Sequence, residues 1–97
     1  MWHEIILAPE AAQDLGKLGA YERAQVKSAL ETHLRFEPAK ASKSRIKQLK
    51  GLTQPQFRLR VDEVRIFYDI AGNRVEVLAI VTKDQAQEWL DRKGKKI

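Results

Sequence analysis

Three arginines, Arg58, Arg60 and Arg65, are spaced so that one β-hairpin would place their guanidinium groups on a single face. Apolar and polar residues alternate on either side of Asp62-Glu63, and a period of two separates them onto the two faces of a sheet. With those two acids as the turn, Arg60 lies opposite Arg65, a like-charge pair that destabilises a ladder by up to about 1 kcal/mol. Guanidinium groups donate paired hydrogen bonds to phosphate oxygens. The hairpin therefore predicts a surface that binds an anion.

A basic segment leads directly into this hairpin. From Pro38 to Val61 the chain carries seven of its 18 basic residues and none of its 13 acidic residues. Such a segment beside a basic sheet face is typical of a phosphate-binding surface, although a solvated surface without a ligand has the same composition. The candidates for contact with RNA phosphates here are Lys43, Arg45, Lys47, Lys50 and Arg60.

Few other groups in the chain offer chemistry. The absence of cysteine excludes disulfides, thiol catalysis and cysteine-ligated zinc. His3 and His33 fall on separate predicted elements without matching carboxylates, so we expect neither a metal site nor a cofactor. The basic face and Lys83 remain. They would stabilise negative charge on phosphate oxygens during a metal-free RNA cleavage in which the RNA's own 2′-OH is the nucleophile.

A single α+β domain over residues 1–97 has to position these side chains. Its two leading helices should cover the apolar face of an antiparallel three-strand meander, with the helices on one face and an open basic face on the other. We also expect a helical turn around residues 44–49. In chain order, the predicted elements are a strand at 2–8, helices at 9–18 and 21–36, strands at 56–61, 64–70 and 74–83, and a short helix at 84–92.

Length and hydropathy indicate a protein of the cytoplasm. The 97 residues suffice for one modest core. No apolar run approaches the roughly 18 residues of a membrane span. The first residues carry an acid, Glu4, and no basic group before their short apolar run, unlike a signal peptide. We therefore expect a cytoplasmic protein without a membrane partner.

The order and spacing of several short motifs resemble the RelE/ParE superfamily, toxins of bacterial type II toxin–antitoxin pairs. The resemblance covers nearly the whole chain. The motifs are the opening strand followed by Pro9-Glu10-Ala11 and Leu15…Leu18, the segment Lys47–Leu52, the hairpin Phe57–Tyr68, the strand Val75–Val81, and Lys83 with Trp89 six residues later.

This resemblance implies one of two activities. RelE-like members cleave mRNA in the ribosomal A site without a metal, whereas ParE-like members share the fold and inhibit DNA gyrase. In both groups a cognate antitoxin wraps and neutralises the toxin, and operator DNA is bound only through the antitoxin. Ribosome-dependent mRNA cleavage is the leading interpretation. Gyrase inhibition and a catalytically degenerate homologue that only binds its antitoxin are the alternatives.

The resemblance also assigns roles to individual residues. Arg65 matches an arginine that stabilises the transition state, Arg58 matches a lysine of the same face, and Lys83 stands where an arginine is the proposed general acid. Gln56 replaces a further lysine. Trp89 stands in place of a catalytic tyrosine; it cannot exchange a proton, and it would stack on an RNA base or pack the last helix onto the sheet. Since Arg65→Ala would remove like-charge repulsion, we expect it to abolish toxicity with little loss of stability.

Overall fold

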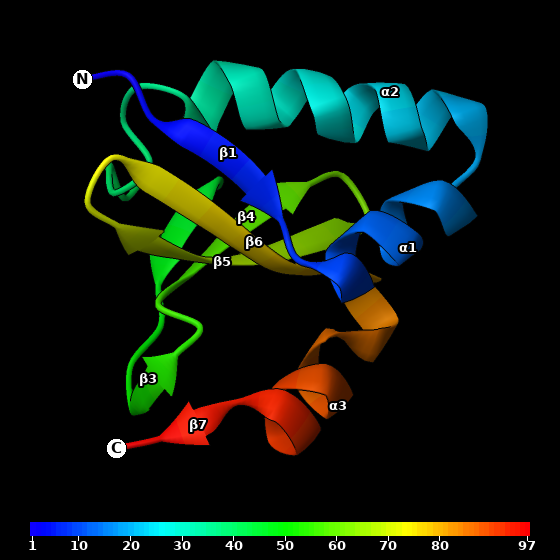
Figure 1. The fold of residues 1–97 in the computed structure, drawn as a ribbon. Helices are drawn as coiled ribbons and strands as arrows, with labels where there is room; N and C mark the ends of the chain where they lie inside the picture. The colour runs from blue at the N-terminus through cyan, green and yellow to red at the C-terminus, as the bar shows by residue number, and fades with distance from the viewer.

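A five-stranded sheet with helices on both faces organises the computed structural model, which describes all of residues 1–97. The sheet order is β1-β6-β5-β4-β2, with β1 parallel to β6 and the other neighbours antiparallel, and β3 pairs with β7 in a second, two-stranded sheet (Figure 1). The α+β class and the meander β4-β5-β6 are as predicted. In chain order, the elements are β1 (Glu4–Leu7), α1 (Pro9–Lys17), α2 (Ala20–Ala29), the π-helical segment η1 (Leu30–Leu34), β2 (Ile46–Gln48), β3 (Leu52–Gln54), β4 (Phe57–Val61), β5 (Val64–Ala71), β6 (Arg74–Thr82), α3 (Lys83–Lys93) and β7 (Lys95–Lys96).

The hairpin β4–β5 has the predicted register. Its last pair joins Val61 to Val64 across a two-residue turn, and the next pair joins Arg60 to Arg65. Asp62 in this turn adopts φ +52°, a left-handed conformation that aspartate tolerates better than most residues with a side chain. A tight two-residue turn is therefore compatible with the absence of glycine here.

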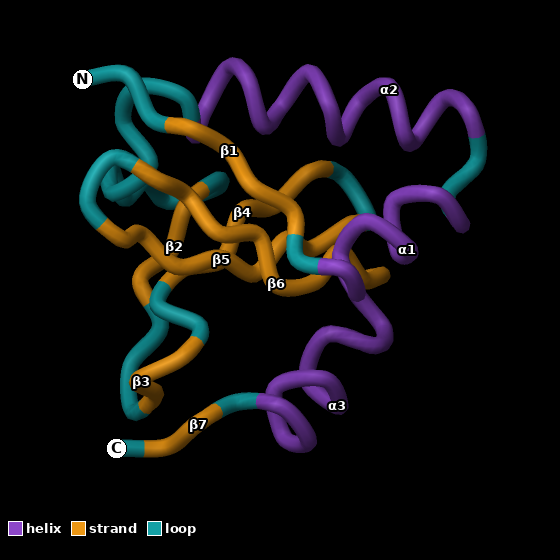
Figure 2. Tube along the Cα trace, viewed as in Figure 1, coloured by secondary structure: helices purple, strands orange, loops and turns teal.

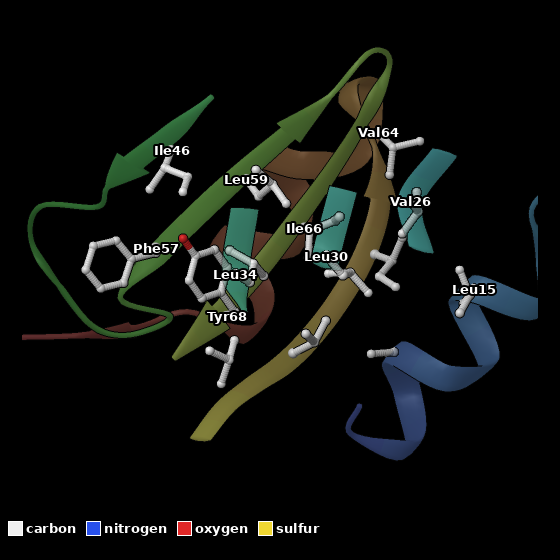
Figure 3. Close-up of a cluster of buried hydrophobic side chains, with 14 residues drawn as sticks. Leu15, Val26, Leu30, Leu34, Ile46, Phe57, Leu59, Val64, Ile66 and Tyr68 are labelled. Atoms are coloured by element: carbon white, nitrogen blue, oxygen red, sulfur yellow. The ribbon is translucent and has the colours of Figure 1, made fainter. Parts of the chain in front are cut away.

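The apolar face of the meander packs against α1, α2 and η1. Helix α1 begins at Pro9, where the missing N–H has no cost because the first amides of a helix lack partners. Tyr68 is fully buried in this core, and its hydroxyl donates to the carbonyl oxygen of Pro38 at 2.7 Å. No helix is both long and apolar enough to span a membrane. Figure 3 shows core side chains of the helices and strands, among them Leu15, Val26, Leu30, Leu34, Leu59, Val64 and Ile66.

The connection between η1 and β4 contains a strand, so the predicted helical turn around residues 44–49 is wrong. Strand β2 pairs with β4 and sets Ile46 opposite Leu59, and Ile46 is buried in the core. This pairing satisfies backbone groups along the outer edge of β4. The stabilisation of β2 depends on its pairing with a segment about ten residues away. A local sequence pattern therefore does not reveal this strand.

Helix α3 packs on the opposite face of the sheet from α1 and α2. The Trp89 indole stacks on the Phe67 ring with 5.0 Å between centroids and 8° between planes, and both are buried together with Ala79. In Figures 1 and 2, α2 lies above the sheet and α3 below it. The prediction that the helices share one face and leave the other open is therefore wrong for this part of the sheet. Phe67 places a large apolar ring among the basic positions, and that ring has to be covered.

The stack of Trp89 on Phe67 should contribute much of the stability of the protein. We expect Trp89→Ala to lower the free energy of unfolding by about 3–5 kcal/mol, the usual loss for a buried aromatic side chain. Chemical denaturation followed by circular dichroism measures this. Trp2→Ala is the matched control because Trp2 is 55% exposed. Equal losses in the two variants would contradict the assignment of Trp89 to a second core.

Candidate nucleic-acid interface

Arg58, Arg60 and Arg65, which we call the arginine cluster, lie on the α3 face of the β4–β5 hairpin. The Arg60 amide donates to the carbonyl oxygen of Arg45 at 2.9 Å, away from β5, so Arg60 and Arg65 form a non-hydrogen-bonded pair. Side chains stand closest in such pairs, with about 4.5 Å between Cα atoms. None of the three guanidinium groups forms an ion pair with a carboxylate. The cluster is therefore a region of uncompensated positive charge.

Arg65 has a structural role as well as a charge. Its side chain is buried, and Nη1 donates to the carbonyl oxygens of Asp62 at 2.7 Å and Val64 at 3.1 Å. These bonds hold the guanidinium in the hairpin turn and support the left-handed Asp62. The expectation that Arg65→Ala leaves stability almost unchanged therefore does not fit the structure, since the variant would remove both bonds.

Arg58 is the member of the cluster whose charge has the least favourable surroundings. Its Nε is buried and has no hydrogen-bond partner. Burial lowers the pKa of the Arg58 guanidinium, and the charges of Arg65 and Arg60 lower it further. Both observations describe a cation that lacks a counter-charge, and an anion such as a phosphate would supply one.

Lys83 is brought to the turn end of the hairpin. It is the first residue of α3, its side chain is exposed, and its amide donates to the carbonyl oxygen of Glu63 at 2.7 Å. Thr82 pairs with Val64 just before it. The start of α3 and the turn that holds Arg65 are thus adjacent, although the catalytic role of Lys83 stays a prediction.

The basic segment before the hairpin divides between two sides of the molecule. Lys47 pairs with Arg58 across β2 and β4, and it lines a cleft together with Lys50. Arg45 instead lines a groove beside α2 with Tyr21, where burial lowers the pKa of His33 and the Arg45 charge lowers it further. Lys47 and Lys50 therefore lie on the side of the arginine cluster, whereas Arg45 meets the cluster through its backbone bond to Arg60. Lys43 is exposed in the loop before β2.

Trp89 and Gln56, which stand at two positions where the family resemblance implies a catalytic residue, stabilise the fold in this structure. Trp89 is buried against Phe67, so of its two predicted roles the packing of the last helix onto the sheet is confirmed, and this burial disfavours stacking on an RNA base. The Gln56 side-chain oxygen accepts a hydrogen bond from the Ile70 backbone amide at 2.9 Å, and the Gln56 backbone amide donates to the Asp69 carboxylate at 2.8 Å. Both side chains attach neighbouring elements to β5. No three His, Asp or Glu side chains group to hold a metal ion.

Residues 5–87 match the family described as the ParE toxin of the type II toxin–antitoxin system parDE. The chain belongs to this toxin family. None of the curated proteins matches the toxin by sequence. The match extends from β1 into α3 and includes the whole arginine cluster, but it stops before Trp89 and β7.

Several solved structures share the fold of the toxin. A free variant of the Escherichia coli toxin RelE is similar with a TM-score of 0.70 and 19% identity, covering 96% of the toxin and 99% of that chain. A RelBE2 toxin–antitoxin complex from Mycobacterium tuberculosis gives 0.67 and 24% identity over 84% and 99%. An archaeal RelE–RelB complex from Pyrococcus horikoshii gives 0.70 and 16% identity over 86% and 97%. At these identities the likeness establishes the fold alone.

The sequence did not indicate that α3 and β7 line a cleft together with the basic segment of the toxin. Lys96 and Gln87 line the same cleft as Lys47 and Lys50. A two-residue strand such as β7 leaves no periodic pattern in the sequence, so local alternation does not place Lys96 in a strand. Only its pairing with Leu52 brings it there.

The unpaired buried donor and the like-charge repulsion at Arg58 predict that replacement of this arginine stabilises the free toxin. We expect Arg58→Met to raise the melting temperature by roughly 4–8 °C, which corresponds to about 1 kcal/mol from the loss of an unpaired buried donor and of like-charge repulsion. Differential scanning calorimetry measures the shift. Arg74→Met is the control, since Arg74 is exposed at the start of β6. A fall in melting temperature for Arg58→Met would contradict this account.

His33 should report the position of the Arg45 charge. Burial lowers the pKa of His33 from its usual 6.5, and Arg45 lowers it further. The unfolded chain therefore binds more protons, so this contribution to stability is complete above about pH 6.5 and is lost as the pH falls toward the folded-state pKa. We expect an NMR titration to give His33 a pKa below 6.5 that rises in Arg45→Gln and stays unchanged in Lys43→Gln. A pKa above 6.5 in the unaltered toxin would refute this.

Proposed function

We propose that the toxin is a metal-independent endonuclease that cleaves mRNA on the ribosome and is neutralised by a cognate antitoxin. The observation that carries this proposal is the arginine cluster. Three guanidinium groups share one face without a carboxylate partner, and one of them keeps a buried donor unpaired. Such an arrangement costs stability unless an anion binds, and the RNA backbone provides that anion.

The chemistry in this proposal relies on electrostatic stabilisation. The 2′-OH of the RNA attacks the adjacent phosphorus, forming a 2′-O–P bond as the bond to the 5′-oxygen breaks. Arg58 and Arg65 stabilise the charge on the non-bridging oxygens. Lys83, exposed beside the turn, gives its proton to the departing 5′-oxygen. The proton of the 2′-OH passes to water or to a ribosomal group.

The buried Trp89 limits the expected rate. A tryptophan in place of a tyrosine removes one proton-transfer group, and general acid or base catalysis contributes about 10²–10⁴ in rate. The proposed enzyme therefore depends more strongly on phosphate stabilisation and on the ribosome than a toxin with all of its proton-transfer groups would.

The cognate antitoxin is the second partner in the proposal. Structures of similar fold include the RelBE2 complex, whose name identifies it as a toxin–antitoxin complex, and an archaeal RelE–RelB complex. An antitoxin segment that places carboxylates on the arginine cluster would neutralise both its charge and its activity. Operator DNA would be reached only through the antitoxin.

Gyrase inhibition is the alternative function. It is favoured by the same Trp89 burial and by the match to a family named for ParE, because an inhibitor needs no proton-transfer groups.

Primer extension on mRNA in a translation extract and a gyrase supercoiling assay distinguish the endonuclease from the gyrase inhibitor. Intact mRNA together with loss of supercoiling would refute the endonuclease. Normal growth on induction without an antitoxin would indicate a homologue that only binds its partner.

Arg58→Met separates function from folding. We expect this variant to fold more stably than the unaltered toxin yet to cleave mRNA about 10²–10³ times more slowly, because it loses one donor to the transition state. Cleavage is followed by primer extension at equal concentrations of folded protein. Arg74→Met, which lies outside the cluster, should cleave at the original rate. Undiminished cleavage by Arg58→Met would exclude a catalytic role for the cluster.

A further inference from the structure

A cleft of about 440 Å³ lies between the β2–β3 connection, α3 and β7. Its rim carries three lysines, Lys47, Lys50 and Lys96, and a single acid, Asp91. All four side chains are exposed. The rim is therefore positive overall and open to a ligand from solvent.

The wall of this cleft is apolar. It consists of Leu49, Leu52 and Leu90, from the β2–β3 connection, β3 and α3. Each of these leucines is only partly buried. Cations around an apolar wall match a nucleotide, which presents a charged phosphate and the largely apolar faces of its base and ribose.

Strand β7 completes the cleft with residues outside the family match, which ends at residue 87. Lys96 pairs with Leu52, and the Ile97 amide donates to the Gly51 carbonyl oxygen at 3.2 Å. Gly94 permits the turn from α3 into β7, since a Cβ there would lie 2.5 Å from the Leu90 carbonyl oxygen. In Figures 1 and 2, β3 and β7 lie side by side below the main sheet.

Lys47 connects the cleft with the arginine cluster. Lys47, on its rim, is the direct partner of Arg58 across β2 and β4, and neighbouring strands are about 4.8 Å apart. A single RNA strand whose phosphate lies on the arginine cluster would therefore enter the cleft with its adjoining nucleotide.

We propose that this cleft is a second nucleotide-binding site for single-stranded RNA, with Lys96 and Lys50 bound to the phosphate next to the one that reacts. The proposal rests on the proposed function and extends it, because it assigns a binding role to the C-terminal strand. The leucine wall contacts the base or ribose of that nucleotide. Asp91 opposes the bound phosphate and weakens binding.

Binding is tested with a short RNA carrying 2′-O-methyl ribose throughout, which lacks the attacking 2′-OH. Fluorescence anisotropy over a range of salt concentrations gives the affinity and its salt dependence. We expect Lys96→Gln to weaken binding about fivefold to tenfold and to reduce the slope of log K against log salt by about 0.7. Lys95→Gln is the matched control, since Lys95 lies on the same strand but lines a different depression.

Removal of the opposing acid should have the reverse effect. Asp91→Asn should tighten RNA binding several-fold, because it removes a negative charge from the rim. Glu88→Gln on the same helix is the control, since Glu88 lies outside the cleft. Opposite signs for Lys96 and Asp91, with neither control changed, would support the proposal, since general unfolding would change both in one direction.

Failure of this inference is distinguishable from failure of the proposed function. If the toxin cleaves mRNA and binds RNA, but Lys96→Gln behaves like Lys95→Gln, the second site is refuted and the endonuclease remains. If Lys96→Gln weakens only the binding of an antitoxin, the cleft is a protein-binding site and the inference is also refuted. If the toxin neither binds RNA nor cleaves mRNA, both proposals fail.

Discussion

The pairing of β4 with β5 is the constraint on which the rest of the structure depends. A shift of one residue would send Leu59 and Ile66 to the outer face and the arginines into the core. Two features hold the register against the repulsion between Arg60 and Arg65. The core side chains Leu59 and Ile66 face each other, and the Arg65 guanidinium bonds to the carbonyls of the turn. The residue that raises the charge of this face thus also closes the hairpin that displays it.

Helix α3 divides the outer face of the sheet into two regions. Near Phe67 and Ala79 the Trp89 indole excludes water and forms a second small core. Beyond this core, Arg60 and the lysines of β2 and its connection are exposed, whereas Arg58 is partly buried and Arg65 is buried. The same helix contributes Leu90 to the wall of the cleft. The burial of Trp89 therefore attaches α3 to the outer face of the sheet.

The unfavourable electrostatics of the outer face are concentrated at Arg58. Arg58 lacks a partner for a buried donor, and burial, together with the neighbouring charges, lowers the pKa of its guanidinium. Groups of this kind destabilise a free protein and concentrate at functional sites. Other polar side chains of the sheet are satisfied, such as Asp69 with Gln54 and Gln56. The unsatisfied buried donor of the sheet therefore belongs to the arginine cluster.

The sequence by itself determined the α+β class, the meander, the hairpin register and the face that carries the three arginines. Each of these follows from alternation with a period of two or from a short turn, which involve residues close together in the chain. Only the tertiary structure decided that Trp89 is buried, that Arg45 lies beside α2 and that Lys96 joins Lys50. These outcomes depend on contacts between distant segments: Trp89 packs on Phe67 of another element, and Lys96 pairs with Leu52. Burial and long-range pairing depend on which elements meet, and a local pattern contains no information about that.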